Sequence, residues 1–358
     1  MTKTFALQNS EKCGILRANI LFFKNSSASL HGIIMASSSN SRRMFLQQSA
    51  VASASMFISS PQEKPDSLSN PDRKRVLRLA HFTDVHVQPE RGAADGMTAC
   101  LRHIHAQKDK PDLLLNGGDS IMDALEQNEA RTQLQWDIFF ETLKRENTIP
   151  IKHCIGNHDV WGWLQDKSGA KGNEPRYGKK WAVEALGLPN RYYSFAQAGW
   201  HFIVLDSTQS RGNAGYEARL DSEQYEWLRG ELASVKPTTP VLILSHIPIL
   251  SMTSAFFLRK AEQNSDWTIQ RNLMHSDGLQ LQQLFRKFPN VKLCLSGHTH
   301  LVDRLDYTGV TYFCDGAVSG AWWKGAWQEC EPGYAMVNLY NDGSFDREYI
   351  TYGWKPRE

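Results

Sequence analysis

Short apolar runs alternate with helical patterns along the chain from residue 76, and each of these runs ends at a few polar or glycine residues. The runs Val76–Phe82, Asp112–Leu115 and Ile149–Ile155 have the length and composition of buried strands. Met97–Gln107 and residues 129–146 have the apolar spacing of helices. This order predicts a parallel α/β sheet, whose ligands bind beyond the carboxyl ends of the strands. We therefore expect the polar residues at the strand ends to meet in space.

The second half of the chain is predicted to contain more strands and fewer helices. Asp221 with Gln224, and Asp277 with Gln280, have the spacing of helix N-caps ahead of apolar helical faces. Residues between about 160 and 192, and residues 250–275, show no regular pattern and are expected to be insertions. Further strands are predicted at Tyr192–Phe195, His201–Asp206, Val241–Leu244, Val291–Leu295 and over much of residues 301–352.

The length and composition predict one large domain with an N-terminal extension. The chain has 358 residues, 41% of them hydrophobic, which is enough for a sizeable core. We divide it into an extension and leader at residues 1–60, a linker at 61–75 and a domain at 76–358. The extension holds six basic residues and one acidic residue, so the remainder has 34 basic against 37 acidic residues, a net charge of −3. This balance argues against a stable nucleic-acid partner.

The extension contains a segment that resembles a twin-arginine export signal. Ser41-Arg42-Arg43-Met44-Phe45-Leu46 precedes a weakly apolar stretch of small residues that runs to Ile58. The alternative is a Ser-rich tail that contains two arginines by chance. The resemblance implies the twin-arginine export machinery as a partner and an exported protein, periplasmic or extracellular. We also hypothesise that translation begins at Met35, which N-terminal sequencing of the precursor would test.

The other segments and the cysteines add weaker constraints. No other segment approaches about 18 uninterrupted apolar residues, so we expect no membrane span in the mature form. Five of the six cysteines lie beyond residue 60, an odd number that does not imply a complete disulfide framework. Cys154 and Cys294 lie in apolar strands and are expected to be buried thiols. One bridge among Cys100, Cys314 and Cys330 remains open for an exported protein.

Five short motifs at the predicted strand ends carry side chains that can bind metal ions. They are Asp84-Val85-His86, Gly118-Asp119, Gly156-Asn157-His158-Asp159, Ser245-His246 and Gly297-His298-Thr299-His300. Carboxylate, amide and imidazole groups suit divalent cations, and there are enough of them for two ions. Two ions about 3.5 Å apart need a shared anionic ligand, and Asp119 on its glycine turn is suited to that position.

Spacing within the motifs supports a convergent site. In each of two pairs of candidate ligands, one residue separates the two members. An extended backbone would therefore point both side chains of a pair to the same side. These pairs are Asp84 with His86, and His298 with His300. Asn157 and His246 complete the set of ligands.

The remaining imidazole of the motifs, that of His158, has a different expected role. Two ions, two carboxylates and a bridging hydroxide would leave a net charge of about +1 to receive a phosphate group. A site that already holds four imidazoles does not need a fifth as a ligand. We therefore expect His158 to remain free and to protonate the leaving alkoxide or stabilise its developing charge.

The ordered set of motifs resembles the signature of calcineurin-like metallophosphoesterases, from about Val76 to beyond His300. Ser245-His246-Ile247-Pro248 is similar to the bacterial phosphodiesterase-like branch of that family. The resemblance implies an α/β fold, a four-layer αββα sandwich of two mixed β-sheets flanked by helices. By motif position, it implies one metal site made of Asp84, His86, Asp119 and His300. It implies a second metal site made of Asp119, Asn157, His246 and His298, with His158 as the catalytic residue.

Two positions depart from branches of the family. Purple acid phosphatases have a tyrosine three residues after the bridging aspartate, where this chain has Met122. The protein phosphatase branch has an aspartate there to pair with the catalytic histidine. Here the nearest carboxylate, Asp123, comes one residue later, which leaves the partner of His158 open.

Aromatic residues near the motifs are candidates for the wall of a substrate pocket. Trp322 and Trp323 lie in the glycine-rich segment 316–324, and Trp161 and Tyr177 lie in the first irregular insertion. Indole faces and backbone exposed by glycine could receive an organic leaving group. Packing in the core is the alternative for all four residues.

The function predicted from these residues is the hydrolysis of a small-molecule phosphate ester by a dinuclear metal centre. A metal-bound hydroxide would act as the nucleophile, and His158 would assist the leaving group. The oxygen and nitrogen ligands accept Mn, Fe or Zn, in a divalent or mixed-valence pair. Two alternatives remain, a phosphodiesterase specific for nucleotides or phospholipid headgroups, and a non-catalytic metal-binding scaffold.

Overall fold

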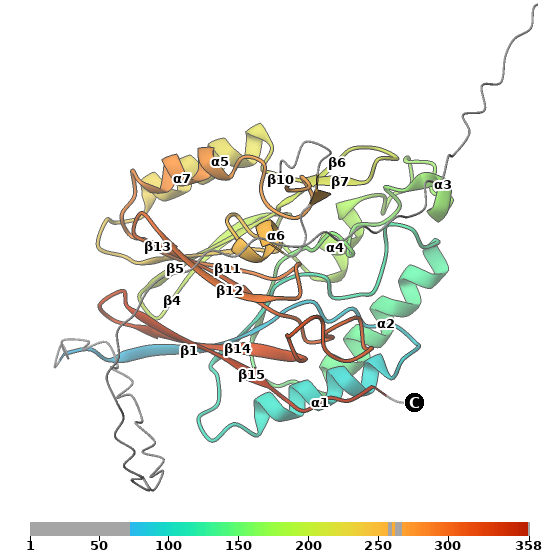
Figure 1. The fold of residues 1–358 in the computed structure, drawn as a ribbon, viewed down its shortest axis with the longest axis horizontal. Helices are drawn as coiled ribbons and strands as arrows, with labels where there is room; N and C mark the ends of the chain where they lie inside the picture. Colours follow the sequence, from blue (N-terminus) through green and yellow to red (C-terminus); the bar gives the residue numbers. More distant parts are fainter. Residues whose placement is uncertain (1–71, 257–259, 262–266, 357–358) are drawn as a thin grey trace, which may run out of the picture. The chain divides into compact units, whose positions relative to one another are not determined.

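Two mixed β-sheets form the centre of the fold in the computed structural model, which describes residues 72–256, 260–261 and 267–356 (Figure 1). The predicted leader with its twin-arginine motif, most of the predicted linker and Cys13 lie outside the described residues. The first sheet has the strand order β15-β14-β1-β2-β3, in which β1, β2 and β3 are parallel and β14 and β15 are antiparallel additions. Its strands are β1 (Arg75–Phe82), β2 (Leu113–Asn116), β3 (Ile151–His153), β14 (Gly333–Tyr340) and β15 (Phe345–Thr351).

The second sheet has six strands in the order β12-β13-β11-β8-β5-β4. Its four central strands are parallel, and the strands at both edges are antiparallel. Its strands are β4 (Tyr193–Gln197), β5 (Trp200–Leu205), β8 (Val241–Ser245), β11 (Val291–Ser296), β12 (Val302–Tyr307) and β13 (Val310–Asp315). The predicted parallel arrangement therefore holds for the strands that precede the motifs, whereas both complete sheets are mixed.

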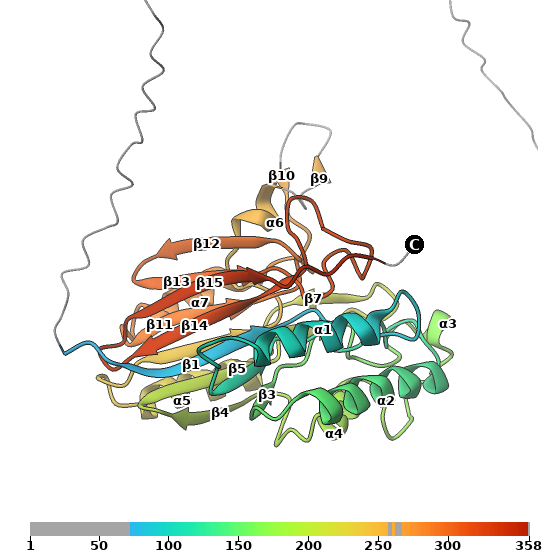
Figure 2. The ribbon, with the colours of Figure 1, turned by 90° about the horizontal axis from the view of Figure 1, so that it is seen from below.

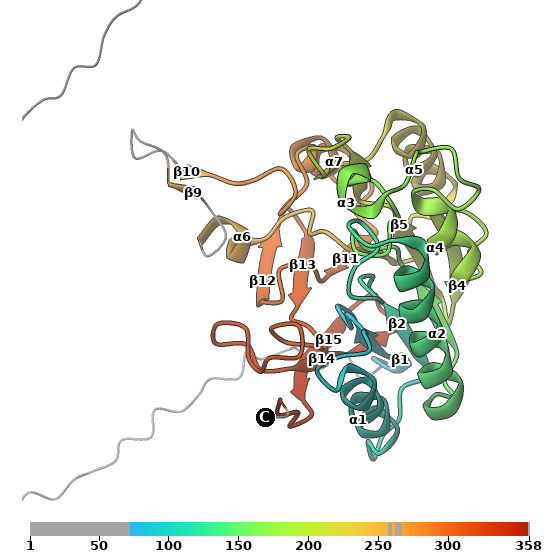
Figure 3. The same cartoon turned by 90° about the vertical axis from the view of Figure 1, so that its right-hand side faces the viewer.

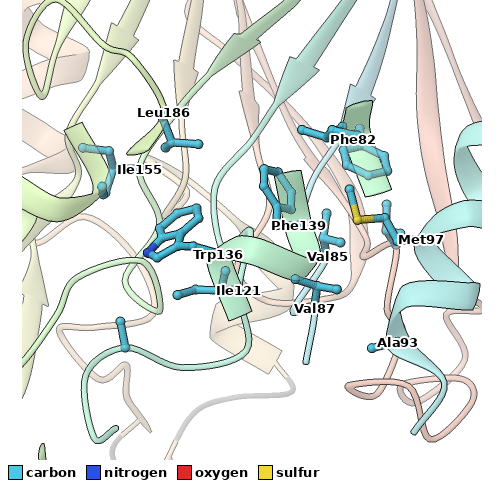
Figure 4. Close-up of a cluster of buried hydrophobic side chains, with 14 of the residues drawn as sticks. Phe82, Val85, Val87, Ala93, Met97, Ile121, Trp136, Phe139, Ile155 and Leu186 are labelled. Atoms are coloured by element: carbon cyan, nitrogen blue, oxygen red, sulfur yellow. The ribbon is translucent and has the colours of Figure 1, made fainter. Parts of the chain in front are cut away.

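Alternation of apolar residues along the strands produces three apolar layers. In β1, Leu77 and Leu79 belong to a core made almost entirely of strand residues from both sheets, including Leu242 and Leu295. The neighbouring Phe82 faces the other way, into a core shared with helices. Figure 4 shows this helix-facing core, in which Phe82, Met97, Trp136 and Phe139 lie together. A third core joins the six-stranded sheet to two further helices through residues such as Ile243, Leu228 and Leu281.

The helices cover the outer faces of the two sheets. Figure 1 shows α5 and α7 on the six-stranded sheet, and Figure 2 shows α1, α2 and α4 together on the five-stranded sheet. The order of the layers is therefore helix, sheet, sheet, helix, which is the predicted sandwich. The helices are α1 (Ala93–His105), α2 (Glu129–Glu146), α3 (Gln165–Ser168), α4 (Lys179–Ala185), α5 (Ser222–Ser234), α6 (Met252–Phe256) and α7 (Gly278–Phe285).

The two predicted N-caps have different outcomes. The Asp221 carboxylate accepts a hydrogen bond from the Gln224 backbone N–H at 2.9 Å, which confirms the predicted cap of α5. Asp277 occupies the predicted N-cap position of α7, but its side chain makes no capping hydrogen bond. Its carboxylate instead accepts a hydrogen bond from the Leu220 backbone N–H and contacts His275 Nδ1 at 2.8 Å.

The two irregular insertions contain short elements beside the main sheets. The first contains α3 and α4. The second contains α6, β9 (Lys260–Ala261) and β10 (Trp267–Thr268), and in Figure 3 these three elements lie beyond β12. A further ribbon, β6 (Thr208–Ser210) with β7 (Tyr216–Ala218), follows β5. None of the helices in the described part of the chain has both the length and the apolar composition needed to cross a membrane.

The cysteines of the described chain are all buried free thiols. They are Cys100, Cys154, Cys294, Cys314 and Cys330. This confirms the predicted burial of Cys154 and Cys294. The bridge left open among the other three does not form: burial raises the pKa of the Cys100 thiol well above its usual value, and Cys314 Sγ instead lies 2.9 Å from the Gly297 carbonyl oxygen.

The close contact between α1 and Trp323 gives a test of the helix-facing core. A Cβ at Gly96 would lie 2.0 Å from the indole of the buried Trp323. Gly96→Ala should lower the free energy of unfolding by about 1–3 kcal/mol through overpacking, more than the gain of about 1 kcal/mol in helix propensity. The matched control is Gly230→Ala in α5, where a Cβ has nothing within 4 Å, and it should stabilise the protein. Urea denaturation measures both; stabilisation by both substitutions would contradict the packing described here.

Candidate metal centre

The carboxyl ends of five strands deliver the seven predicted ligands. Asp84, Asp119 and Asn157 follow β1, β2 and β3 of the five-stranded sheet. His246 directly follows β8, and the pair His298 and His300 follows β11, in the six-stranded sheet. The two sheets therefore contribute ligands from opposite sides of one site. Six of the seven are buried, and His298 is partly buried.

The first group of ligands contains Asp84, His86, His300 and Asp119. The ligand atoms of Asp84, His86 and His300 all lie within 4.8 Å of one another. His86 Nε2 lies 3.0 Å from His300 Nε2, and His300 Nε2 lies 3.3 Å from Asp84 Oδ1. His86 Nε2 also lies 3.6 Å from Asp119 Oδ2. These are the four side chains predicted for one metal.

The second group contains Asp119, His246, Asn157 and His298. His246 Nε2 lies 3.1 Å from Asp119 Oδ2 and 3.2 Å from Asn157 Oδ1. Asp119, His246 and His298 form a set whose ligand atoms lie within 4.8 Å of one another. Asp119 is thus present in both groups, as expected for a shared ligand.

Backbone carbonyls orient three of the four imidazoles. His246 Nδ1 lies 2.9 Å from the Gly117 carbonyl oxygen, His300 Nδ1 2.5 Å from that of Gly320, and His298 Nε2 2.7 Å from that of Asn272. A neutral imidazole that donates its outer N–H in this way keeps the lone pair of its inner nitrogen directed into the site. His86 Nδ1 has no hydrogen-bond partner among the described residues.

The donor set fits divalent cations. Two ligand atoms that each lie about 2.1 Å from one ion are about 3–3.4 Å apart. His300 Nε2 lies at such distances from His86 Nε2 (3.0 Å) and from Asp84 Oδ1 (3.3 Å), whereas His86 Nε2 and Asp84 Oδ1 are 3.8 Å apart. Inward lone pairs and carboxylate oxygens would otherwise repel one another in a buried site. The mixture of oxygen and nitrogen ligands without thiolates suits Mn, Fe or Zn and does not select one of them.

The charges of the cluster depend on one another. Burial alone would lower the pKa of His246, but the Asp119 carboxylate beside it raises that pKa to about 9. Burial and the charge of His246 lower the pKa of His298 to about 3. Binding of a cation at His246 therefore competes with a proton, because only the neutral imidazole is a ligand.

The backbone at the ligands is left-handed rather than extended. Positive φ angles occur at Asp84 (55°), His86 (47°), Asp119 (51°), His298 (68°) and His300 (58°). The extended geometry expected for the two spaced pairs is therefore wrong. The strands have ended before the ligands, and the turning backbone aims the side chains. Each such residue costs about 1–3 kcal/mol, which the surrounding structure must offset.

His158 lies beside the first group of ligands. Its ring centroid is 4.7 Å from that of His86, and its backbone N–H donates to Asp119 Oδ1 at 2.8 Å. The ring is partly exposed, and its Nδ1 has no hydrogen-bond partner among the described residues. The Asp123 carboxylate accepts hydrogen bonds from the Glu126 backbone and from Gln127 and makes none with His158.

Asp159 is an important residue to which the sequence interpretation gave no role. Its buried carboxylate accepts backbone hydrogen bonds from Ser120, Ile121 and Gly156, at 2.9, 3.3 and 2.9 Å. It thereby clamps the turn of Asn157 to the turn of Asp119. Burial and the nearby charge of Asp119 raise the pKa of Asp159 to about 7. The signal in the sequence that could have identified Asp159 is its position in the same turn as Asn157.

The four predicted substrate residues occupy different environments. Trp161 and Trp323 are buried in the helix-facing core, and their indole N–H groups donate to the carbonyls of Gln127 and His86. They pack in the core and do not form a pocket wall. Trp322 is partly exposed, and its ring centroid lies 4.6 Å from that of His300, so it is positioned against the site. Tyr177 packs against the same core, and its hydroxyl accepts from Gln165.

A cleft of about 450 Å³ opens beside the ligands. Asn157 and His158 line it on one side, Arg211 and Tyr216 of the β6–β7 ribbon line it on another, and residues 270–272 complete the wall. A cleft of this volume is in the range of small-molecule sites. The sequence analysis made no prediction for the residues of the ribbon, and it assigned segment 270–272 to an irregular insertion without a site residue.

Close packing of glycines against the carboxylates gives a test of the centre. A Cβ at Gly156 would lie 2.1 Å from Asp119 Oδ1 and from the Asp119 backbone nitrogen. Gly156→Ala should displace the shared carboxylate and weaken Mn²⁺ binding by about 10- to 100-fold. Calorimetric titration of Mn²⁺ measures the effect, and Gly230→Ala, distant from any close contact, is the control. Unchanged affinity in Gly156→Ala would argue against Asp119 as a ligand.

Comparison with known proteins agrees with this geometry. The sequence pattern of the calcineurin-like phosphoesterase family matches residues 77–302. A 3′,5′-cyclic-nucleotide phosphodiesterase of Nostoc sp. is 26% identical over 286 residues, which cover 76% of this chain and 92% of that protein. A 3′,5′-cyclic adenosine monophosphate phosphodiesterase of Escherichia coli is 23% identical over 240 residues, which cover 65% and 73% of the two chains.

Among solved structures, a dimetal phosphatase from Danio rerio superposes with a TM-score of 0.52 and 14% identity, covering 78% of this chain and 100% of that one. That likeness supports the four-layer fold. The family match spans more than half of the chain and contains all five ligand motifs. The protein therefore belongs to the calcineurin-like phosphoesterase family and is a phosphoric ester hydrolase.

Proposed function

We propose that this protein is a dinuclear metal-dependent phosphodiesterase that acts on small organic phosphodiesters. The observation that carries the proposal is that Asp119 lies between two groups of candidate ligands, 3.6 Å from His86 Nε2 on one side and 3.1 Å from His246 Nε2 on the other, while His158 lies beside His86 and Asp119. One ion would be held by Asp84, His86, Asp119 and His300. The other would be held by Asp119, Asn157, His246 and His298. Bound cations would neutralise the phosphoryl oxygens and lower the pKa of the attacking water.

The residues around the ligands hold the site in one arrangement. Asp84 is fixed by the His298 backbone N–H, which lies 3.0 Å from both carboxylate oxygens, and by the Thr83 hydroxyl at 2.6 Å. Asp119 is fixed by the His158 backbone N–H. Preorganised ligands need no rearrangement when the charge of the substrate changes during the reaction.

His158 is suited to hold a proton for the leaving alkoxide. Its position is set through its own backbone, which is bonded to Asp119, rather than through its ring. The His158 side chain lines the adjoining cleft, and because its Nδ1 is buried, its Nε2 is the atom proposed to bond a substrate oxygen there. A protonated imidazole within hydrogen-bond reach of a leaving oxygen can act as its general acid.

Two observations favour diesters over monoesters. The cleft beside Asn157 and His158 offers space for an organic group beyond the scissile phosphate. The relatives from Nostoc and Escherichia coli, most of whose lengths are matched, are named as phosphodiesterases of cyclic nucleotides. Nucleotide diesters are therefore the first substrates to test.

Removal of metal tests the proposed function. The purified protein with added Mn²⁺ should hydrolyse bis(4-nitrophenyl) phosphate faster than 4-nitrophenyl phosphate. A chelator should abolish both activities, and fresh Mn²⁺ should restore them, since the ligands alone do not activate water. Elemental analysis should find two ions per chain. If the Mn²⁺-loaded protein released nitrophenolate from neither ester, the non-catalytic scaffold would be favoured instead.

Substitution of His158 tests its role as a proton donor. His158→Gln should retain both ions but lower kcat by about 100-fold or more for an alkyl ester, whose leaving group needs a proton. The loss should be much smaller for a 4-nitrophenyl ester, since nitrophenolate leaves without one. His105→Gln in α1, where His105 contacts Asn147, is the control and should behave as wild type. Equal losses for the two leaving groups would exclude general-acid catalysis by His158.

A further inference from the structure

The cleft beside the ligands contains two guanidinium groups that the proposed chemistry does not use. Arg211 and Arg271 both line it, on the side formed by the β6–β7 ribbon and segment 270–272. The only carboxylate of the lining is Glu126, which pairs with Lys167 at 2.5 Å. The cleft therefore offers positive charge that the lining itself does not neutralise.

Arg211 is held at the cleft by its backbone while its side chain is left available. Its backbone N–H donates to the Gly215 carbonyl at 2.8 Å and so closes the tip of the β6–β7 ribbon. Asn213 in the same tip donates to Asp166 Oδ2 at 3.0 Å, which joins the ribbon to α3. The Arg211 guanidinium makes no hydrogen bond or ion pair with any of the described residues. An arginine in this state can accept an anion without first losing another partner.

Arg271 has only a weak partner. Its Nη1 lies 3.4 Å from Glu217 Oε2, and its side chain is 70% exposed. Exposed ion pairs of this kind contribute little, and Glu217 also has Arg219 at 2.7 Å. Arg271 can therefore turn toward a ligand in the cleft at small cost.

The rest of the cleft suits an organic group between these arginines and the ligands. Leu125, Leu164 and Ala214 supply apolar surface, and Gln270 and Asn272 supply amides. The ring of Tyr216 lies beside the ligands, with its centroid 6.3 Å from that of His298. A substrate could therefore place its phosphodiester at the ligands and its organic part across the cleft toward Arg211.

We propose that Arg211 and Arg271 bind a second anionic group of the substrate, a phosphate or a carboxylate on its organic part. This rests on the proposed function. The scissile phosphate has two cations as its counter-charge, so the arginines are available for another anion. A 3′,5′-cyclic nucleotide has a single phosphate and would leave both arginines without an anionic partner. The inferred substrate is therefore a diester with an additional negative charge.

The test compares esters that differ only in the second anion. One pair is thymidine 5′-(4-nitrophenyl phosphate) with and without a 3′-phosphate. The other is 4-nitrophenyl phenyl phosphate with and without a 3-carboxylate on the phenyl ring. With the Mn²⁺-loaded full chain, the added anion should lower KM by about tenfold, as expected for a charge-assisted hydrogen bond. A response to only one pair identifies which anion, phosphate or carboxylate, the site accepts.

Two variants and a control assign the effect to the arginines. Arg211→Gln and Arg271→Gln should each bring the KM of the ester without the second anion closer to the KM of the ester that has it. Arg211→Glu should make the KM of the ester with the second anion the higher of the two. Added salt should also reduce the ratio. Arg229→Gln in α5, where Arg229 pairs with Glu226, should retain the wild-type ratio.

The outcomes separate this inference from the proposed function. Equal KM values within both pairs in the wild type would overturn the second anion site. So would an equal rise in KM for both members of a pair in Arg211→Gln. Calorimetry can compare the affinity for thymidine 3′,5′-bisphosphate with that for thymidine 5′-phosphate, and this measurement does not require turnover. Tighter binding of the bisphosphate that depends on Arg211, together with no hydrolysis of any ester, would support the site and reject the enzymatic proposal.

Discussion

The arrangement of the domain depends on the convergence of two buried carboxylates with the inner nitrogens of four imidazoles. Asp84 and Asp119 are almost fully shielded from water, and His86 Nε2 lies 3.0 Å from His300 Nε2. Without a counter-charge, such a cluster is unfavourable, because buried anions and lone pairs repel one another. Cations relieve this repulsion. The fold must therefore hold the ligands in place against their own repulsion until a cation arrives.

Several features of the chain provide this restraint. Gly156 and Gly297 allow the backbone to approach Asp119 and Asp84 so closely that a Cβ would lie about 2 Å from a carboxylate oxygen. Asp159 clamps two ligand turns together through three backbone N–H groups. Five of the candidate ligands have a left-handed backbone, so part of the backbone strain of the domain lies at the site itself. Packing of the two sheets behind the site supplies the favourable energy that offsets it.

The sequence predicted the parts of the site that depend on residue identity and order. Motifs that follow strands identified side chains that the fold brings together, because the carboxyl ends of parallel strands lie at one edge of a sheet. It did not predict the left-handed backbone at Asp84 and His86, since positive φ depends on contacts with other turns. Trp161 and Trp323 were ambiguous for a similar reason: an indole packs equally well in a core or in a wall. Arg211 could not be found because its segment has no periodicity.

The candidate metal centre and the proposed second anion site share a segment of the chain. The carbonyl of Asn272 orients the imidazole of His298, whereas the neighbouring Arg271 and Gln270 line the cleft. Side chains of this segment can change without altering the ligand, because the hydrogen bond to His298 uses only the backbone. The conformation of the segment is more constrained than its side chains. If Arg271 binds substrate as proposed, substitutions of such exposed side chains would change substrate preference without disturbing the backbone path at Asn272.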